Sequence, residues 1–144
     1  MKQIENKKNV YVIGVFDLFH RGHLELLKKA KKLGDRLIVA INGDDMVSKY
    51  KRKPIFNEED RLAIISSLRL VDEAFIIRIF DNKKVMIDRK VDIIVHGTDW
   101  DRDSYLKQIR VTESFLDENE ISLELVPYTN GISTSDLVST IKNS

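Results

Sequence analysis

Five short runs of hydrophobic, mostly β-branched residues occur along the chain, each bounded by polar positions. Runs of this length between turn-forming residues are typical of strands that are buried on both faces of a sheet. They predict strands over residues 10–15, 37–41, 74–79, 93–96 and 123–126.

Between these runs, hydrophobic positions recur every three or four residues, which predicts helices. The helical segments cover residues 24–33, 58–68, 83–89, 105–119 and 134–142. Strands that alternate with helices at this spacing form right-handed βαβ units. The pattern therefore predicts an α/β fold, a single-domain, Rossmann-like sheet of five parallel strands with helices on both faces.

The composition fits one compact domain over residues 1–144. Hydrophobic residues make up 42% of the chain and charged residues 33%, which allows a sizeable core without covalent cross-links. The chain contains no cysteine, so a thiolate nucleophile, a cysteine-ligated zinc site and a disulfide framework are all excluded.

Charge and hydropathy narrow the range of partners. The formal net charge is +1 with acidic and basic residues mixed along the chain, so we expect no nucleic-acid partner. The polar N-terminus leads into a hydrophobic run too short for a signal peptide, and no stretch reaches membrane-spanning length. We therefore expect a cytoplasmic protein without a membrane partner.

Polar and glycine-containing segments follow four of the predicted strands. They are residues 14–23, 42–53, 97–100 and 128–135, and the second of them carries Lys49, Lys51, Arg52 and Lys53. In an open parallel sheet, ligands bind beyond the carboxyl ends of the strands. The four segments are therefore expected to converge on one site.

The segment after the first strand carries the most informative chemistry. It contains His20-Arg21-Gly22-His23 and runs into a helix that is predicted to begin near Gly22 or His23. A helix N-terminus presents free N–H groups that suit an anion such as a triphosphate, and Gly22 lets a ligand approach closely. The two imidazoles can donate hydrogen bonds to phosphate oxygens on which charge develops.

The two histidines fit a phosphate site better than a simple helix cap or a zinc site. A single histidine would most often cap the helix or remain solvated, but here two flank a glycine, with Asp17 just before them. A helical zinc pair is normally spaced i, i+4 and needs further ligands, so we expect no metal site built from protein ligands. The dinucleotide fingerprint Gly-x-Gly-x-x-Gly is absent.

Together with further motifs, this segment resembles the cytidylyltransferase family of nucleotidyltransferases. The motifs are Phe16-Asp17, the His20–His23 element, Arg61, Gly97-Thr98-Asp99-Trp100 and Gly131-Ile132-Ser133-Thr134-Ser135. The resemblance implies that a phosphate oxygen of an acceptor attacks the α-phosphorus of CTP, giving a CDP-linked product and pyrophosphate. The acceptor would be a phosphorylated small alcohol, first of all glycerol 3-phosphate, and the product would feed a surface polymer or lipid.

The resemblance also implies roles for individual residues. The catalytic residues would be His20, His23, Arg52 and Arg61. Ser133 and Thr134 would hold the β- and γ-phosphates. The whole nucleotide-binding set is Val15, Phe16, Asp17, Gly22, Lys53, Gly97, Asp99, Trp100, Thr129, Gly131, Ile132, Ser133 and Thr134. Mg²⁺ would accompany CTP, and the enzyme would form a homodimer.

Three of these assignments leave an alternative open. Arg61 could equally be a solvent-facing helix residue, and Asp99 could cap a turn. Asp17 could bind the magnesium ion or orient a histidine.

Some positions depart from the family pattern. Tyr50 and Tyr128 stand where the family carries a cation, Arg52 replaces a lysine, and His96 and Thr98 are smaller changes beside the acceptor pocket. Two alternatives to a CTP-dependent enzyme remain open. The loss of cations favours a nucleotide-binding module with weak or lost catalysis. The histidine element also serves adenine nucleotides, which favours an adenylyltransferase that uses ATP.

Overall fold

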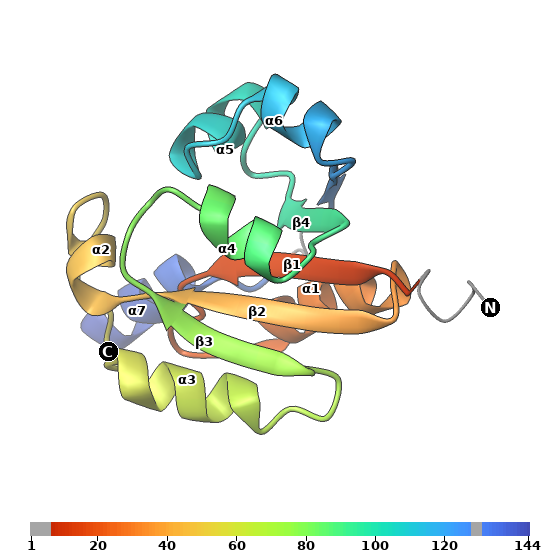
Figure 1. Ribbon diagram of the computed structural model, residues 1–144. Helices are drawn as coiled ribbons and strands as arrows, with labels where there is room; N and C mark the ends of the chain where they lie inside the picture. The colour runs from red at the N-terminus through yellow and green to blue at the C-terminus, as the bar shows by residue number, and fades with distance from the viewer. Residues whose placement is uncertain (1–6, 128–130) are drawn as a thin grey trace.

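The computed structural model describes residues 7–127 and 131–144. Its centre is a sheet of five parallel strands in the order β3-β2-β1-β4-β5 (Figure 1). The strands are β1 (Asn9–Gly14), β2 (Arg36–Asn42), β3 (Glu73–Ile77), β4 (Ile93–Gly97) and β5 (Ser122–Val126). The five predicted strands and their parallel arrangement are confirmed, although β3 ends at Ile77 rather than at Ile79.

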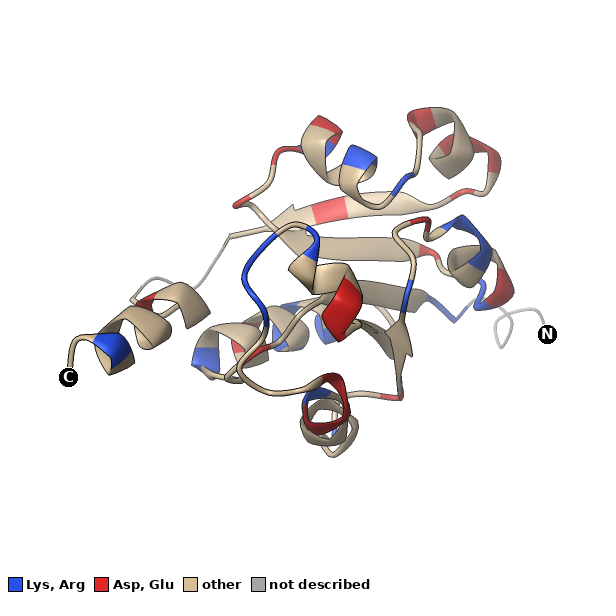
Figure 2. Cartoon of the chain, turned by 90° about the vertical axis from the view of Figure 1, so that its left-hand side faces the viewer, with Lys and Arg blue, Asp and Glu red and all other residues tan. Residues whose placement is uncertain are grey.

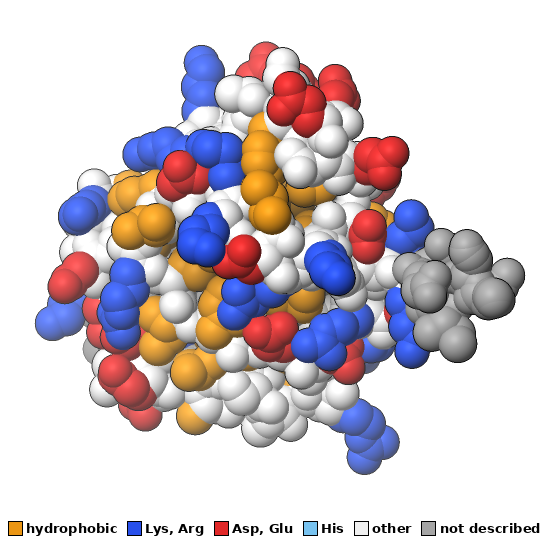
Figure 3. All heavy atoms as spheres, viewed as in Figure 1, with side chains coloured by type: hydrophobic (Ala, Val, Ile, Leu, Met, Phe, Trp, Pro, Cys, Tyr) orange, Lys and Arg blue, Asp and Glu red, His pale blue; other side chains and the backbone are white. Residues whose placement is uncertain are grey.

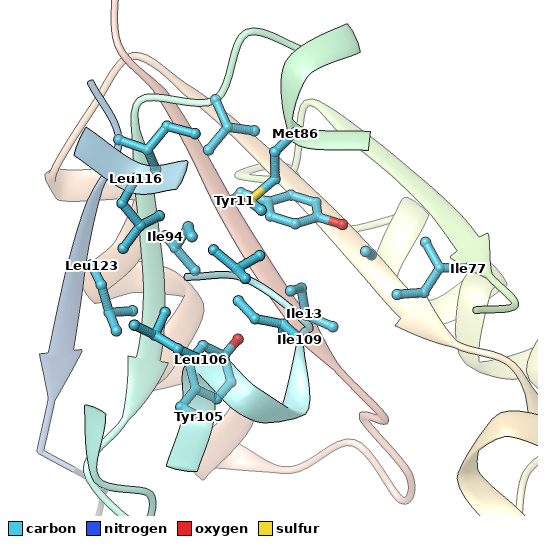
Figure 4. Close-up of a cluster of buried hydrophobic side chains, with 14 of the residues drawn as sticks. Tyr11, Ile13, Ile77, Met86, Ile94, Tyr105, Leu106, Ile109, Leu116 and Leu123 are labelled. Carbon is cyan, nitrogen blue, oxygen red and sulfur yellow. The ribbon is translucent and has the colours of Figure 1, made fainter. Parts of the chain in front are cut away.

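Helices cover both faces of the sheet. They are α1 (Arg21–Lys32), α2 (Asp44–Ser48), α3 (Glu58–Ser66), α4 (Lys83–Asp88), α5 (Arg102–Gln108), α6 (Glu113–Glu118) and α7 (Thr134–Lys142). Alternation along β1 builds the two layers: Val10 and Val12 pack with α1 and α3, whereas Tyr11 and Ile13 pack with α4, α5 and α6. Figure 4 shows the second of these clusters, with Tyr11 and Tyr105 among its members.

The strand order reverses beside β1. From β1 the chain adds β2 and β3 on one side, and it then crosses back to place β4 and β5 on the other. The loops that follow β1 and β4 therefore diverge, which is where an open α/β sheet forms its ligand crevice. Two further segments, the one after β2 and the start of α7, lie at the same edge.

The single helix expected over residues 105–119 is wrong. The structure has two short helices there, α5 and α6, separated by a turn in which Arg110 has φ 59°. Ile109 and Val111 are both buried, but two positions apart on one continuous helix they would face nearly opposite directions. The turn lets both reach the core, and Thr112 then caps α6 by accepting the Phe115 amide.

The segment between β2 and α3 begins with the five-residue helix α2, which is too short to show as a periodic pattern. Asn57 caps α3 by accepting the Asp60 amide. On the face shown in Figure 3, acidic and basic side chains are interspersed. Among the described residues, no helix has both the length and the apolar character needed to span a membrane.

Candidate active site

A cavity of about 990 Å³ lies at the carboxyl ends of β1, β2 and β4. Figure 2 looks onto this edge of the sheet, with the lysine- and arginine-bearing loop after α2 in front of it. All four motif segments contribute to the wall of the cavity, so they converge as expected. Residues 128–130 lie outside the described residues, so the expected role of Thr129 stays a prediction.

Most of the predicted site residues line this cavity. Those that do are Val15, Phe16, Asp17, His20, His23, Arg52, Asp99, Trp100, Gly131, Ile132, Ser133 and Thr134. Gly22, Lys53, Arg61 and Gly97 are not part of its wall. Gly97 is instead paired with Val126 inside the sheet.

The two histidines are held by the backbone at the start of α1. His20 is the N-cap residue, and its Nδ1 accepts the Gly22 amide at 3.0 Å. His23 Nδ1 accepts the His20 amide at 3.1 Å, and the two rings stack with centroids 3.8 Å apart. Because each Nδ1 is an acceptor, each neutral ring carries its proton on Nε2. Both Nε2–H groups are therefore free to donate to a ligand.

Gly22 does not line the cavity, but its lack of a side chain leaves room for the His20 ring. A Cβ at this position would lie 2.8 Å from Cε1 of the His20 ring and 3.5 Å from Ile132. Any larger residue would push the His20 ring out of its capping position. The glycine is therefore required by the histidine arrangement.

Both histidines are neutral at ordinary pH. Burial, together with the neighbouring His20 ring, lowers the pKa of His23 to about 3, and burial also lowers the pKa of His20. Phe16 and Phe19 pack against the His23 ring, with ring centroids 5.5 and 5.4 Å from the centroid of His23. The apolar contacts thus keep His23 as a neutral hydrogen-bond donor.

Asp17 fastens the loop that follows α2 to the histidine segment. Its carboxylate accepts the amides of Ile55 at 2.7 Å and Phe56 at 2.9 Å, and it contacts Arg52 at 3.3 Å. Burial alone would raise the pKa of Asp17, but these hydrogen bonds lower it below its usual value. The contacts of Asp17 thus show an anchoring role. Its two roles suggested by the sequence, as a magnesium ligand or as a residue that orients a histidine, stay predictions.

Part of the cationic loop after α2 lines the cavity and part of it does not. Lys51 has an exposed side chain that lines the cavity, and the partial desolvation of its ammonium group, followed by the nearby Arg52 charge, lowers its pKa. Tyr50 also faces the cavity, and its hydroxyl accepts the Asn42 side-chain amide at 2.9 Å. Lys53 is exposed and does not contribute to the cavity wall, and its expected role in nucleotide binding stays a prediction.

Arg61 is neither solvent-facing nor part of the cavity. Its side chain has no exposed surface, and it donates to the carbonyls of Val15 at 2.9 Å, Asn42 at 2.8 Å and Phe56 at 3.0 Å. It also pairs with Asp44 at 2.6 Å. The guanidinium therefore ties together the segments after β1, after β2 and before α3. The solvent-facing alternative is wrong, and the expected role of Arg61 toward the triphosphate stays a prediction.

The segment after β4 forms the opposite wall. Asp99 lies with Oδ1 3.7 Å from His96 Nε2, and burial raises the pKa of Asp99. The His96 ring stacks on Tyr105 of α5, with centroids 4.2 Å apart, and Trp100 meets Tyr105 edge to face. These residues enclose the side of the cavity away from the histidine pair.

The start of α7 closes the cavity beside α1. Ser133 caps α7 by accepting the Asp136 amide, and the Thr134 hydroxyl donates to the Asp17 carbonyl at 2.8 Å. Gly131 has φ 89°, a left-handed conformation that favours glycine. Two helix N-termini, those of α1 and α7, are thus held side by side, an arrangement suited to several phosphates.

Some wall residues were not predicted from the sequence, namely Asn42, Phe80, Asn82, Tyr105 and Gln108. Asn42 could have been found, because it is the last residue of β2 and so lies at the ligand-binding edge. The others come from α5 and from the loop before α4. No local pattern marks them, since their position depends on packing between distant segments.

The family model described as cytidylyltransferase-like matches residues 11–140. The glycerol-3-phosphate cytidylyltransferase of Bacillus subtilis is 35% identical over 132 residues, covering 90% of this chain and 94% of that protein. The FAD synthase of Thermoplasma volcanium is 44% identical over 90 residues, covering 62% of this chain and 63% of that one.

Solved structures show the same relationship. The lipopolysaccharide core biosynthesis protein from Thermoplasma volcanium GSS1 superimposes with a TM-score of 0.70 at 34% identity. The match covers 88% of this chain and 100% of that one. The family model, the relatives and the fold agree, and the chain belongs to the cytidylyltransferase-like family.

Proposed function

We propose that this protein transfers CMP from CTP to a phosphorylated small alcohol, with glycerol 3-phosphate as the first candidate, and releases pyrophosphate. The observation that carries the proposal is the backbone-locked pair of histidines at the start of α1. Their Nε2–H groups face a cavity into which two helix N-termini and a cationic loop also point. Each of these features favours a polyphosphate ligand.

The geometry supports a direct displacement. A phosphate oxygen of the acceptor attacks the α-phosphorus of CTP, a new P–O bond forms, and the bond to the oxygen that bridges to the β-phosphorus breaks. That oxygen leaves with pyrophosphate and keeps the electron pair. The protein need supply no nucleophile, so catalysis consists of positioning and of stabilising the charge that develops on the phosphate oxygens.

Individual residues have separate parts in this scheme. His20 and His23 donate to oxygens of the reacting phosphate from a fixed geometry, without a loss of side-chain freedom. The α7 amides and Ser133 would hold the β- and γ-phosphates. Lys51 and Arg52 add positive charge where two anionic substrates must approach each other.

Magnesium fits this site as a companion of the triphosphate rather than as a resident ion. No group of three or more His, Cys, Asp or Glu is arranged to hold a metal within residues 7–127 and 131–144. The Asp17 carboxylate is already engaged by three donors. Mg²⁺ often relies on substrate phosphates with few protein ligands, and when bound it would neutralise phosphate charge.

A specific observation supports each alternative. The FAD synthase relative makes a product that contains adenine, so family membership does not by itself select CTP over ATP. The Tyr50 hydroxyl takes the place of a family cation and is held by Asn42, which supports a weakly active nucleotide-binding module. We also retain the homodimer as a proposal, to be checked by light scattering.

One assay separates these possibilities. Pyrophosphate release is measured with CTP and with ATP in parallel, each against a panel of phosphate monoesters. Release with CTP and glycerol 3-phosphate supports the proposal, and release with ATP alone favours the adenylyltransferase. Tight CTP binding without release for any acceptor favours the binding module.

A further inference from the structure

The side of the cavity away from the histidine pair contains buried polar atoms without partners. They are Asn42 Oδ1, Tyr105 Oη and both ring nitrogens of His96, none of which has a hydrogen-bond partner among the described residues. All three side chains form part of the cavity wall, and we call them the inner recess. Buried polar atoms are nearly always paired, so an unpaired group facing a cavity indicates a ligand.

Neighbouring buried polar groups behave differently. The Tyr11 hydroxyl donates to Asn82 Oδ1 at 2.8 Å, and Asn82 Nδ2 donates to the Phe80 carbonyl at 2.9 Å. Tyr11 does not contribute to the cavity wall, whereas Tyr105 does. Of these two tyrosines, the one outside the cavity wall has a paired hydroxyl and the one in the wall has an unpaired hydroxyl.

The chemistry of the unpaired atoms defines what they can bind. Neutral imidazole offers one donor and one acceptor, a phenol hydroxyl offers both, and an amide oxygen only accepts. A partner must therefore donate and accept at closely spaced positions. Hydroxyl groups do both, an ammonium group only donates, and a trimethylammonium group does neither.

The charges around the inner recess disfavour a cationic ligand. Asp99 is the nearby carboxylate; burial raises its pKa overall, and the positive charge of Lys51, with Arg52 next to it, opposes the negative charge of this carboxylate. Burial, with a further contribution from Lys51, lowers the pKa of His96 to about 4, so this ring is neutral. Within the described parts of the chain, the recess thus offers no unopposed negative charge to attract an ammonium group.

We propose that His96, Tyr105 and Asn42 select the acceptor by binding hydroxyl groups on its uncharged alcohol part. This inference rests on the proposed function, since it names the substrate class of the same reaction: a polyhydroxy phosphate rather than an amino-alcohol phosphate. The transferred phosphate would then lie between the inner recess and the histidine pair. A small polyol phosphate and a sugar phosphate share this chemistry. They differ in size, so comparing a short and a long acceptor distinguishes them.

Two phenylalanine variants test the proposal as a matched pair. Tyr105→Phe removes only an unpaired hydroxyl, so we expect an unchanged or higher Tm and a KM for the hydroxylated acceptor that rises about fivefold or more. Tyr11→Phe removes a paired hydroxyl, so we expect a lower Tm and an unchanged acceptor KM. In both variants the Kd for CTP should stay within about twofold of wild type.

The acceptor series uses glycerol 3-phosphate, a hexose 1-phosphate, phosphoethanolamine and phosphocholine. Binding of each is measured by calorimetry in the presence of a non-hydrolysable CTP analogue, beside the turnover assay. We expect a hydroxylated acceptor to bind at least tenfold more tightly than either amino-alcohol phosphate, because the latter leave the inner recess unpaired. His96→Phe, which keeps the stacking on Tyr105, should reduce this preference.

The two measurements separate the inference from the function on which it rests. Binding of a hydroxylated acceptor that weakens in Tyr105→Phe supports the inner recess even if no pyrophosphate is released, and that result would refute the proposed function alone. Turnover that is unaffected by Tyr105→Phe and His96→Phe would refute the inner recess alone. Preferred binding of phosphocholine or phosphoethanolamine, or binding of no acceptor at all, would also overturn it.

Discussion

The Nδ1 atom of His23 accepts the backbone amide of His20 at 3.1 Å, while the two imidazole rings stack 3.8 Å apart. This relationship couples the start of α1 to the proposed chemistry. The same contacts that cap the helix fix the protonation of both rings and direct Nε2–H toward the cavity. A local capping motif thus becomes a preorganised pair of donors.

His23→Ala should lower kcat by about 10² to 10³-fold, the usual effect of removing one preorganised donor to developing charge. The variant also loses a cap, which costs about 1 kcal/mol of stability. His23→Asn serves as the control, because its side-chain oxygen can still accept the His20 amide. A kcat near that of wild type in His23→Ala, measured on folded protein, would remove the histidine pair from the mechanism.

Acidification should destabilise the protein below about pH 6.5, well above the range in which carboxylates titrate. The pKa values of His23 and His96 in the folded protein are about 3 and about 4, below the value near 6.5 expected when unfolded. Between these limits the unfolded state binds more protons, so stability falls as the pH falls. The loss from pH 7 to pH 5 should be about 2 kcal/mol for each histidine.

Urea unfolding at the two pH values measures this effect, and His96→Asn should reduce it by about 2 kcal/mol. Equal unfolding free energies at pH 7 and pH 5 would show that the two rings are already protonated in the folded state.

Arg61→Met should destabilise the fold by about 3 to 5 kcal/mol, because it leaves Asp44 and three carbonyl groups without their shared partner. Denaturant unfolding gives the value. Arg61→Lys keeps the charge but not the fork of donors, so a smaller loss is expected. If Arg61→Met unfolds like wild type but raises KM for CTP, the guanidinium contacts the phosphates directly and the structural assignment fails.

Asp17→Asn should loosen the loop that follows α2. The amide side chain accepts more weakly than a carboxylate and loses the ion pair with Arg52, so the Ile55 and Phe56 amides should exchange with deuterium faster. The Mg²⁺ concentration needed for half-maximal activity should stay the same. A large rise in that concentration, with no change in amide exchange, would instead make Asp17 a metal ligand.

The sheet and the histidine segment could be predicted from sequence because their determinants are local. Central strands such as residues 37–41 are apolar throughout, and a strand, a glycine and a helix start surround His20. The environment of Arg61 could not be predicted, because its position in the helix is compatible with either a buried or a solvated guanidinium. Its hydrogen-bond partners come from distant segments and are known only from the structure.

The inner recess is a second example. Tyr105 looks like a core residue in the sequence, and its unpaired hydroxyl appears only when α5 is packed beside β4. The break after α5 was missed for the same reason, since burial of both Ile109 and Val111 depends on the tertiary fold.

The most direct measurement follows a radioactive label from CTP into the product. The protein is incubated with glycerol 3-phosphate and CTP that is labelled with ³²P at either the α- or the γ-phosphate, and the products are separated by chromatography. We predict that the α-label appears in a CDP-linked product and the γ-label in pyrophosphate, with both signals lost in His23→Ala. Transfer of the γ-label to the acceptor, or no transfer of the α-label to any phosphate monoester, would contradict the proposed reaction.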